Sequence, residues 1–217
     1  MSIRAIIFDK DGTLHDTEKV YMQAWKAAAE EFGGIPDIED TVRDCTGTSI
    51  PFIAEYWAKK YPHIPFEDYL PRRQHHYFGI LEKGIPVKEG AYELLTYLKA
   101  HGYKVGMATS TPWDTVKDHL ERTDMMGYFD TIVTGDMIEH GKPAPDIYLL
   151  AAERLGVDPA ECIGVEDSMS GVRSIHAAGM RAVMIPDMIQ PAPDVEALVW
   201  RKLDCLTDMV PLLEGEN

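Results

Sequence analysis

The sequence predicts an α/β fold, a doubly wound parallel sheet of the Rossmann-like kind, with an α-helical domain inserted into it. Three observations lead to this prediction. Short apolar runs recur along the chain, helical patterns lie between them, and one long stretch has helical periodicity without a strand. We therefore expect an α/β core domain over residues 1–17 and 84–217, and a helical domain over residues 18–83.

The expected strands are apolar on both faces, as strands are when helices cover a sheet from both sides. They occupy residues 3–8, 104–108, 131–133, 162–165 and 182–185, with another near residues 198–200. Helical patterns separate them over residues 94–98, 113–120, 147–155 and 172–178. Strand and helix in alternation predict a doubly wound sheet, whose ligands bind at the carboxyl ends of the strands.

The stretch over residues 18–83 shows helical periodicity instead. Aromatic and small apolar residues repeat at helical spacing over residues 21–32, and a glycine pair ends that segment. A second pattern covers residues 53–57, and a weaker one covers residues 69–80. The insert carries a net charge of −3 and the remainder −12, so the insert is the less acidic part. That balance suits a lid over an anion.

The composition is that of a folded globular protein. Hydrophobic residues make up 45% of the 217 residues, and 21 Lys+Arg against 36 Asp+Glu give a net charge of −15. This acidic balance argues against nucleic acid and against an anionic membrane surface as partners, because both attract clustered lysine and arginine. A small anionic substrate remains compatible, because one metal ion and one lysine can reverse the charge locally.

Localisation and thiol chemistry can also be predicted. The first apolar run is too short for a secretion signal, and no run approaches the roughly 18–20 residues that cross a bilayer. We therefore expect a cytoplasmic protein without a membrane partner, either a monomer or a weak homodimer. Cys45, Cys162 and Cys205 are far apart and odd in number, which favours reduced thiols over a zinc site or a disulfide framework.

Two carboxylates follow the first expected strand. Asp9 and Asp11 are two positions apart, on the same side of an extended chain, and Gly12 permits a sharp turn after them. One carboxylate can attack phosphorus and form an acyl phosphate. The other can give a proton to the leaving oxygen and later take one from water. The alternative interpretation is an ordinary Asp-Gly turn after a strand.

The next two motifs offer groups that bind anions. Thr109 and Ser110 end the second strand and precede a helix, whose free N–H groups bind anions. Lys142 precedes two prolines along a stiff stretch of chain, where an ammonium could neutralise a phosphate and keep Asp9 ionised. Taken singly, an ordinary helix N-cap and a solvated lysine are the favoured interpretations.

Acidic residues also follow the strand at residues 162–165. Glu166 and Asp167 at the end of an apolar strand are costly to bury without a cation, and their hard oxygen ligands point to Mg²⁺. An N-cap formed by Asp167 or Ser168 explains them equally well in isolation. The combination of the four motifs decides in favour of a functional site, because all four lie at the carboxyl ends of expected strands. Together they supply a nucleophile, an acid/base, a hydroxyl, a cation and a metal site for phosphoryl transfer.

These four motifs, in this order, resemble those of the haloacid dehalogenase superfamily, in its phosphatase and phosphomutase branch. The matching segments are residues 9–14, 108–110, 141–146 and 164–168. The resemblance covers nearly the whole chain apart from the interior of the insert and the tail. It implies the Rossmann-like core of that family, and it implies that residues 18–83 form the family's small α-helical cap.

The resemblance implies roles for the first pair of carboxylates. Asp9 looks like the nucleophile that becomes an aspartyl-phosphate and also ligates Mg²⁺. Asp11 looks like the general acid/base, with its backbone carbonyl on the metal. Dehalogenases of the superfamily lack this second aspartate, because a leaving halide needs no proton. Its presence therefore argues against dehalogenation.

The resemblance also implies roles for the later motifs. Thr109 and the Ser110 amide would bind the transferring phosphoryl group, and Lys142 would bridge that group and Asp9. Asp167 would ligate Mg²⁺, and Glu166 would do so directly or through water. The implied ligand set for Mg²⁺ is thus Asp9, Asp11, Glu166 and Asp167.

Within the superfamily, residues 16–17, 24–26 and 28–31 look like those of β-phosphoglucomutase and its related sugar phosphatases. We expect a Mg²⁺-dependent phosphatase that hydrolyses small phosphorylated metabolites, with sugar phosphates as the substrate class. A β-phosphoglucomutase-type mutase is the alternative, and a non-catalytic sensor of a phosphometabolite is a third possibility. Against the mutase, Tyr21 replaces a cap histidine, and Ile50 replaces an arginine just after residues 47–49.

An arginine of that kind would grip the second phosphate of a bisphosphate intermediate. Arg43, Arg72 or Arg73 could substitute for it, so the mutase alternative stays open.

Overall fold

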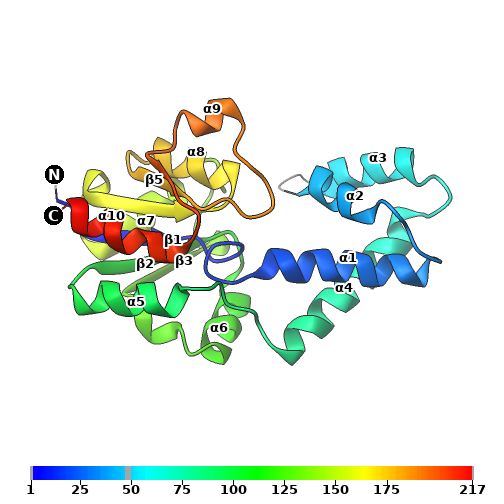
Figure 1. Ribbon diagram of the computed structural model, residues 1–217, viewed down its shortest axis with the longest axis horizontal. Helices are drawn as coiled ribbons and strands as arrows, with labels where there is room; N and C mark the ends of the chain where they lie inside the picture. The colour runs from blue at the N-terminus through cyan, green and yellow to red at the C-terminus, as the bar shows by residue number, and fades with distance from the viewer. Residues whose placement is uncertain (1, 47–49, 217) are drawn as a thin grey trace. The chain divides into compact units, whose positions relative to one another are not determined.

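The computed structural model describes residues 2–46 and 50–216. The chain divides into two compact units, one formed by the chain up to His15 and from Val87 onward, the other by Asp16–Pro86. Every strand of the described residues lies in the first unit, and the second unit is helical (Figure 1). Each unit is described by itself below.

The first unit is built on a parallel sheet. Its strand order is β3-β2-β1-β4-β5-β6, and every neighbouring pair is parallel. The strands are β1 (Ala5–Phe8), β2 (Lys104–Thr109), β3 (Thr131–Thr134), β4 (Cys162–Glu166), β5 (Arg181–Met184) and β6 (Arg201–Lys202). The predicted doubly wound sheet is therefore confirmed. The order reverses between β1 and β4, and a sheet of this kind offers its ligand crevice at that point.

Two layers of helices cover this sheet because its strands are apolar on both faces (Figure 1). Ile6 and Phe8 of β1 point into one hydrophobic cluster, and Ala5 and Ile7 point into the other, as the two-residue period of a strand requires. The first cluster is closed by α5 (Ala91–Ala100), α6 (Trp113–Arg122) and α10 (Met209–Glu216). The second is closed by α7 (Asp146–Leu155), α8 (Met169–Ala177) and α9 (Pro193–Glu196).

The second unit has an aromatic core. Its helices are α1 (Thr17–Glu31), α2 (Ile38–Cys45), α3 (Ile50–Lys60) and α4 (Phe66–Lys83). Trp25, Trp57 and Tyr69 are buried against one another, and the Tyr69 hydroxyl donates to the Trp25 carbonyl at 2.6 Å. These three aromatic residues, one each from α1, α3 and α4, therefore form the core of this unit.

The structure differs from the sequence expectation in three elements. The last strand is β6 rather than residues 198–200, because Leu198 and Val199 pack into a hydrophobic cluster instead of pairing with β5. The helix α2 was not expected, since its eight residues include Glu39, Asp40, Arg43 and Asp44. The weak third pattern of the insert is one long helix, α4, which continues through an internal proline.

None of the described helices combines the length and the apolar character needed to cross a membrane.

Candidate active site

The candidate site lies at the carboxyl ends of three adjacent strands. Phe8 of β1 is level with Met107 of β2 on one side and with Val165 of β4 on the other. The next residue of each strand or strand end is therefore Asp9, Ala108 or Glu166, and these three lie on one rung of the sheet. This rung is at the reversal of strand order, where a doubly wound sheet binds its ligands.

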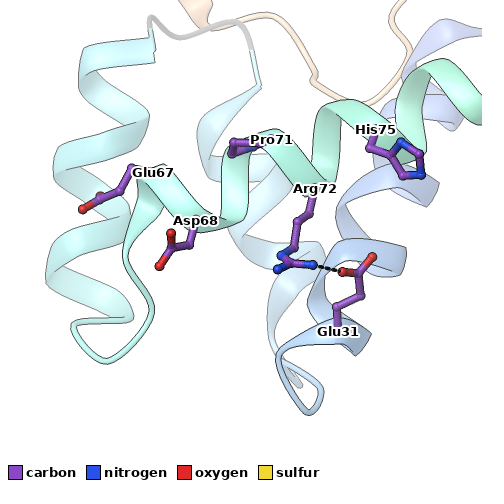
Figure 2. A pocket seen from close by; sticks show the side chains of 6 residues that line it. All are labelled: Glu31, Glu67, Asp68, Pro71, Arg72 and His75. Atoms are coloured by element: carbon purple, nitrogen blue, oxygen red, sulfur yellow. Dashed lines mark hydrogen bonds and ion pairs between the residues drawn. The ribbon is translucent and has the colours of Figure 1, made fainter.

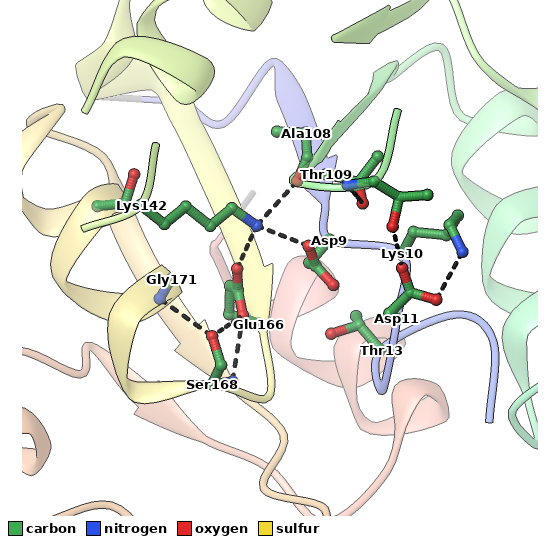
Figure 3. Close-up of polar contacts among 12 residues, drawn as sticks. Asp9, Lys10, Asp11, Thr13, Ala108, Thr109, Lys142, Glu166, Ser168 and Gly171 are labelled. Carbon is green, nitrogen blue, oxygen red and sulfur yellow. Dashed lines mark hydrogen bonds and ion pairs between the residues drawn. The ribbon is translucent and has the colours of Figure 1, made fainter. Parts of the chain in front are cut away.

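Lys142 joins the three strands of this rung (Figure 3). It lies in the turn before α7, and its Nζ donates to Asp9 Oδ1 at 2.6 Å, to Glu166 Oε1 at 2.6 Å and to the Ala108 carbonyl at 3.0 Å. Its side chain is only 6% exposed. Burial alone would lower the pKa of Lys142, but the charges of Asp9 and Glu166 raise that pKa above its ordinary value. The ammonium is therefore kept charged inside the protein.

Asp9 is a buried carboxylate whose charged neighbours shift its pKa in opposite directions. Burial raises the pKa of Asp9, Lys142 lowers it, and Glu166 and Asp11 raise it further, to about 7 in all. Its backbone N–H donates to the Val165 carbonyl at 2.9 Å, which fixes the residue at the end of the sheet. A second cation beside Asp9 would favour the ionised form, which is the nucleophilic one.

Glu166 is a buried carboxylate with hydrogen bonds on both oxygens. Its Oε1 accepts hydrogen bonds from Lys142 and from the Tyr148 hydroxyl at 3.1 Å. Its Oε2 accepts from the backbone N–H and the hydroxyl of Ser168, at 3.1 and 2.8 Å. The side chain is 1% exposed, and these four bonds explain how a carboxylate is accommodated there. Both oxygens of Glu166 are thus engaged with protein donors.

Gly171 leaves the space for this carboxylate. A Cβ atom on Gly171 would lie 1.8 Å from Glu166 Oε1, so no larger residue fits without moving Glu166. Gly12 has the same role beside Asp167: its φ is +82°, and a Cβ would lie 2.2 Å from Asp167 Oδ2. Two glycines therefore let the acidic side chains approach the turns around them.

Three carboxylates are close enough to hold a metal ion. Asp9, Glu166 and Asp167 each offer one oxygen atom, and these three atoms lie within 4.8 Å of one another. Asp167 Oδ1 also accepts from the Thr13 hydroxyl at 3.3 Å. The Asp11 side chain does not belong to this group, and its expected contribution through the backbone carbonyl stays a prediction.

The Asp11 carboxylate is bonded on both oxygens (Figure 3). Its Oδ1 accepts from Lys10 Nζ at 2.6 Å, and its Oδ2 accepts from the Thr111 hydroxyl at 2.6 Å. Thr109, the last residue of β2, is buried, and its hydroxyl oxygen accepts from the Thr111 backbone N–H at 3.2 Å. Ser110 follows β2 directly and is exposed. The structure thus places all seven expected residues at one edge of the sheet.

Two residues of the site were not expected from the sequence. Tyr148 reads as one more apolar residue on the buried face of its helix, and no sequence signal separates it from its neighbours. Lys10 lies inside the first motif, where its position between two aspartates could have marked it. Ser168 was expected only as a possible N-cap, and its hydroxyl does accept from the Gly171 N–H at 3.0 Å while it also donates to Glu166.

The parallel α/β fold and the acidic residues at the carboxyl-end edge of its sheet define the class of protein. A family model described as a haloacid dehalogenase-like hydrolase matches residues 3–179. The chain belongs to that family of hydrolases, and the resemblance predicted from its motifs is confirmed.

Named relatives narrow the class. A phosphorylated carbohydrates phosphatase of Thermotoga maritima is 37% identical over 185 residues, 83% of this chain and 84% of that protein. A beta-phosphoglucomutase of Bacillus subtilis is 33% identical over 189 residues, 83% of this chain and 82% of that protein. The solved structure of CbbY from Rhodobacter sphaeroides in complex with phosphate has a TM-score of 0.71 and 27% identity, covering 95% of this chain and 96% of that one. The chain is thus an enzyme of the phosphatase class within its family.

The helical unit has a separate hollow of about 400 Å³ between α1 and α4 residues (Figure 2). Glu31, Glu67 and Asp68 line it together with His75 and Arg72. The Arg72 guanidinium already donates to Glu31 at 2.6 Å. Acidic groups outnumber the single, paired arginine, so this hollow is a poor site for a phosphate.

Proposed function

We propose that this protein is a Mg²⁺-dependent phosphatase that hydrolyses small phosphorylated metabolites, with sugar phosphates as its substrate class, through an aspartyl-phosphate on Asp9. The observation that carries this proposal is the position of Lys142, whose ammonium lies 2.6 Å from both Asp9 and Glu166 on one rung of three strands. A buried cation beside a buried nucleophile suits a reaction in which negative phosphoryl oxygens must approach a carboxylate.

In the first half of the reaction, a carboxylate oxygen of Asp9 attacks phosphorus. The bond from phosphorus to the ester oxygen breaks, and that oxygen takes a proton from Asp11 and leaves as an alcohol. The ammonium of Lys142 offsets the charge of the phosphoryl oxygens. Thr109 and the amide of Ser110 would donate to the same group.

In the second half, water regenerates the enzyme. Its oxygen attacks the phosphorus of the aspartyl-phosphate while one of its protons passes to Asp11. The bond between phosphorus and the Asp9 oxygen breaks, which returns the carboxylate and releases inorganic phosphate. Asp11 ends the cycle protonated, ready for the next substrate.

The donor set fits the ion that the family implies. Asp9 and Asp167 supply hard carboxylate oxygens, and the 4.8 Å limit among the acidic oxygens is compatible with a single ion. Glu166 has both oxygens engaged by protein donors, so we assign it to orienting Lys142 and to ligation through water. When bound, Mg²⁺ would neutralise carboxylate and phosphoryl charge.

The names of two relatives support the proposed substrate class. The similar Thermotoga maritima protein is named a phosphorylated carbohydrates phosphatase, and a hexitol phosphatase B of Escherichia coli is 28% identical over 214 residues. The expected role of residues 18–83 as a cap, the cytoplasmic location and a monomeric or weakly dimeric state stay predictions.

The mutase alternative needs a group that holds a second phosphate. Residues 47–49, beside which the mutase arginine is expected, lie outside the described residues. Arg72 is paired with Glu31, and Arg43 is paired with Asp40 at 2.7 Å. Arg73 is buried with its guanidinium 5.0 Å above the Tyr21 ring. Because Arg72 and Arg43 are paired with carboxylates, hydrolysis is the favoured outcome.

The test uses turnover of p-nitrophenyl phosphate in the presence of Mg²⁺. Asp9→Asn is expected to abolish it, and Asp118→Asn, an exposed aspartate of α6, serves as the matched control. Retention of most activity by Asp9→Asn would refute the nucleophile assignment. Incubation of wild type with β-glucose 1-phosphate and a trace of the bisphosphate then separates the reactions: free phosphate means a hydrolase, and glucose 6-phosphate means a mutase.

A further inference from the structure

A fully buried lysine lies between the two aspartates of the first motif. The exposed fraction of Lys10 is 0%. Its Nζ donates to Asp11 Oδ1 at 2.6 Å and contacts His119 Nδ1, on α6, at 3.3 Å. An ammonium in the protein interior is unfavourable unless a carboxylate and further acceptors compensate it. The phosphatase reaction described above makes no use of this lysine.

The partner on the far side of Lys10 is a neutral histidine. An ammonium has only donors, so His119 Nδ1 must accept, and the ring proton lies on Nε2. Burial lowers the pKa of His119, and the charge of Lys10 lowers it further, so the ring stays neutral. His119 therefore acts as a fixed acceptor that holds the lysine from the helix layer.

A second buried histidine, His15, packs against His119. The Thr123 hydroxyl gives its proton to the His119 carbonyl at 2.7 Å, so it accepts from His15 Nε2 at 3.3 Å. His15 and His119 meet edge to face at 5.9 Å between ring centroids. Burial lowers the pKa of His15 to about 3. Both rings are thus neutral, and neither competes with the ammonium for Asp11.

The Asp11 carboxylate receives one short hydrogen bond on each oxygen, and the two donors come from different parts of the fold. Lys10 is at the end of β1, and Thr111 follows β2. The side chain of Asp11 is 32% exposed, unlike the lysine beneath it. These two bonds restrict rotation of the carboxyl group, and burial of Lys10 restricts movement of the lysine.

We propose that Lys10, anchored by His119, is a positioning residue that together with Thr111 fixes the orientation of the Asp11 carboxylate for proton transfer. This inference rests on the proposed phosphatase reaction with Asp11 as its acid/base. Lys10 contacts Asp11 and His119, so we infer that it acts through Asp11. If the orientation of Asp11 were not fixed, proton transfer to a poor leaving group would be slow. A good leaving group departs without that proton and would be little affected.

The experiment compares kcat/KM for phenyl phosphate, a poor leaving group, and 2,4-dinitrophenyl phosphate, a good one. Lys10→Met keeps the length of the side chain and removes its charge. We expect kcat/KM to fall at least about tenfold for phenyl phosphate, part of the roughly 10²–10⁴-fold that general acid catalysis supplies, and about twofold or less for 2,4-dinitrophenyl phosphate. With the good leaving group, kcat is expected to fall and a burst of dinitrophenolate to appear, because Asp11 is still needed to activate water.

Thr111→Val provides an independent variant if Lys10→Met does not fold. It removes the other hydrogen bond to Asp11 and is expected to give the same dependence on the leaving group, whereas Thr111→Ser retains the hydroxyl and should restore wild-type kinetics. Lys99→Met, a lysine of α5 paired with Asp130, is the matched control and should leave both substrates unaffected.

The outcomes separate the two claims. An equal loss on both substrates in Lys10→Met and in Thr111→Val would show a merely structural role and overturn the positioning inference while leaving the phosphatase intact. No turnover of either ester by the wild-type enzyme would overturn the proposed function and the inference together.

Discussion

Gly171 offers a sharp test of the site, because alanine there should be harmful in a helix where it is normally favourable. Gly171 lies in the first turn of α8, and a Cβ atom would come 1.8 Å from Glu166 Oε1 and 1.9 Å from its Cδ. The carboxylate must therefore retreat by about 1 Å or more to reach even a tight contact, a shift that hydrogen-bond geometry does not tolerate.

The expected loss in the free energy of unfolding can be worked out from the hydrogen bonds that Glu166 would lose. Glu166 accepts four hydrogen bonds, and we expect Gly171→Ala to break two of them. At about 1.5–3 kcal/mol for each bond to a charged group, the loss in the free energy of unfolding is about 3–6 kcal/mol. Greater helix propensity returns at most about 1 kcal/mol. The net loss of about 2–5 kcal/mol corresponds to a fall in Tm of roughly 5–20 °C.

Activity should fall as well, because Glu166 holds Lys142 beside Asp9. A displacement of about 1 Å at a reacting centre can lower the rate about 100-fold, so we expect a 10- to 100-fold loss in kcat. Thermal unfolding and p-nitrophenyl phosphate hydrolysis measure the two effects on the same preparation.

Gly79→Ala is the matched control for this substitution. Gly79 lies inside α4, and a Cβ atom there meets no heavy atom within 4 Å. This variant should be as active as wild type and more stable by up to about 1 kcal/mol. The reasoning is refuted if Gly171→Ala matches Gly79→Ala in both stability and activity.

Two further predictions concern groups outside the reaction. Burial raises the pKa of Cys162 to about 12 and also raises the pKa of Cys45, whereas Cys205 is exposed; Ellman's reagent should therefore titrate one thiol in the native protein and three after denaturation, and two fast thiols would contradict this. Burial lowers the pKa of His15 from 6.5 to about 3, so between these values the unfolded chain binds a proton that the folded chain does not. Stability should therefore fall as pH falls through this window, by up to about 5 kcal/mol, and urea titrations at several pH values should show a shallower fall in His15→Gln.

The sheet and its acidic edge could be predicted because buried parallel strands have a local signature. Residues 3–8 are apolar without alternation and stop abruptly at Asp9, and the same holds where Cys162–Glu166 ends beside Asp167. The carboxyl ends of parallel strands meet at one edge, so these acidic residues were expected to converge there. Their hydrogen-bond partners could not be predicted, since they depend on the rotamers of packed side chains.

Sequence signals were weak for α2, for the length of α4 and for two residues of the site. In α2 the buried residues Ile38, Thr41, Val42 and Cys45 do fall at helical spacing, but eight residues give only about two turns of this pattern among four charged side chains. Pro71 within α4 reads as a helix breaker. The Tyr148 hydroxyl contacts Glu166 because of how α7 packs on the sheet, and this contact cannot be predicted from the sequence of α7 alone. Lys10 is the opposite case, since its place between two aspartates was visible but its burial was not.

Lys10 and Lys142 each contact different carboxylates at the acidic edge of the sheet, and this arrangement affects the charge available to bind a metal ion. Lys142 serves Asp9 and Glu166, and Lys10 serves Asp11. With Asp11 protonated, as the proposed cycle leaves it, the other three carboxylates, with Asp167 included, against two ammonium groups leave a formal charge of −1 at the edge. Binding of Mg²⁺ would bring the edge to a formal charge of +1, which suits the approach of an anionic phosphate ester. On this reasoning the separate cation for Asp11 is useful, because it leaves Lys142 and the metal ion free to act on the phosphoryl group.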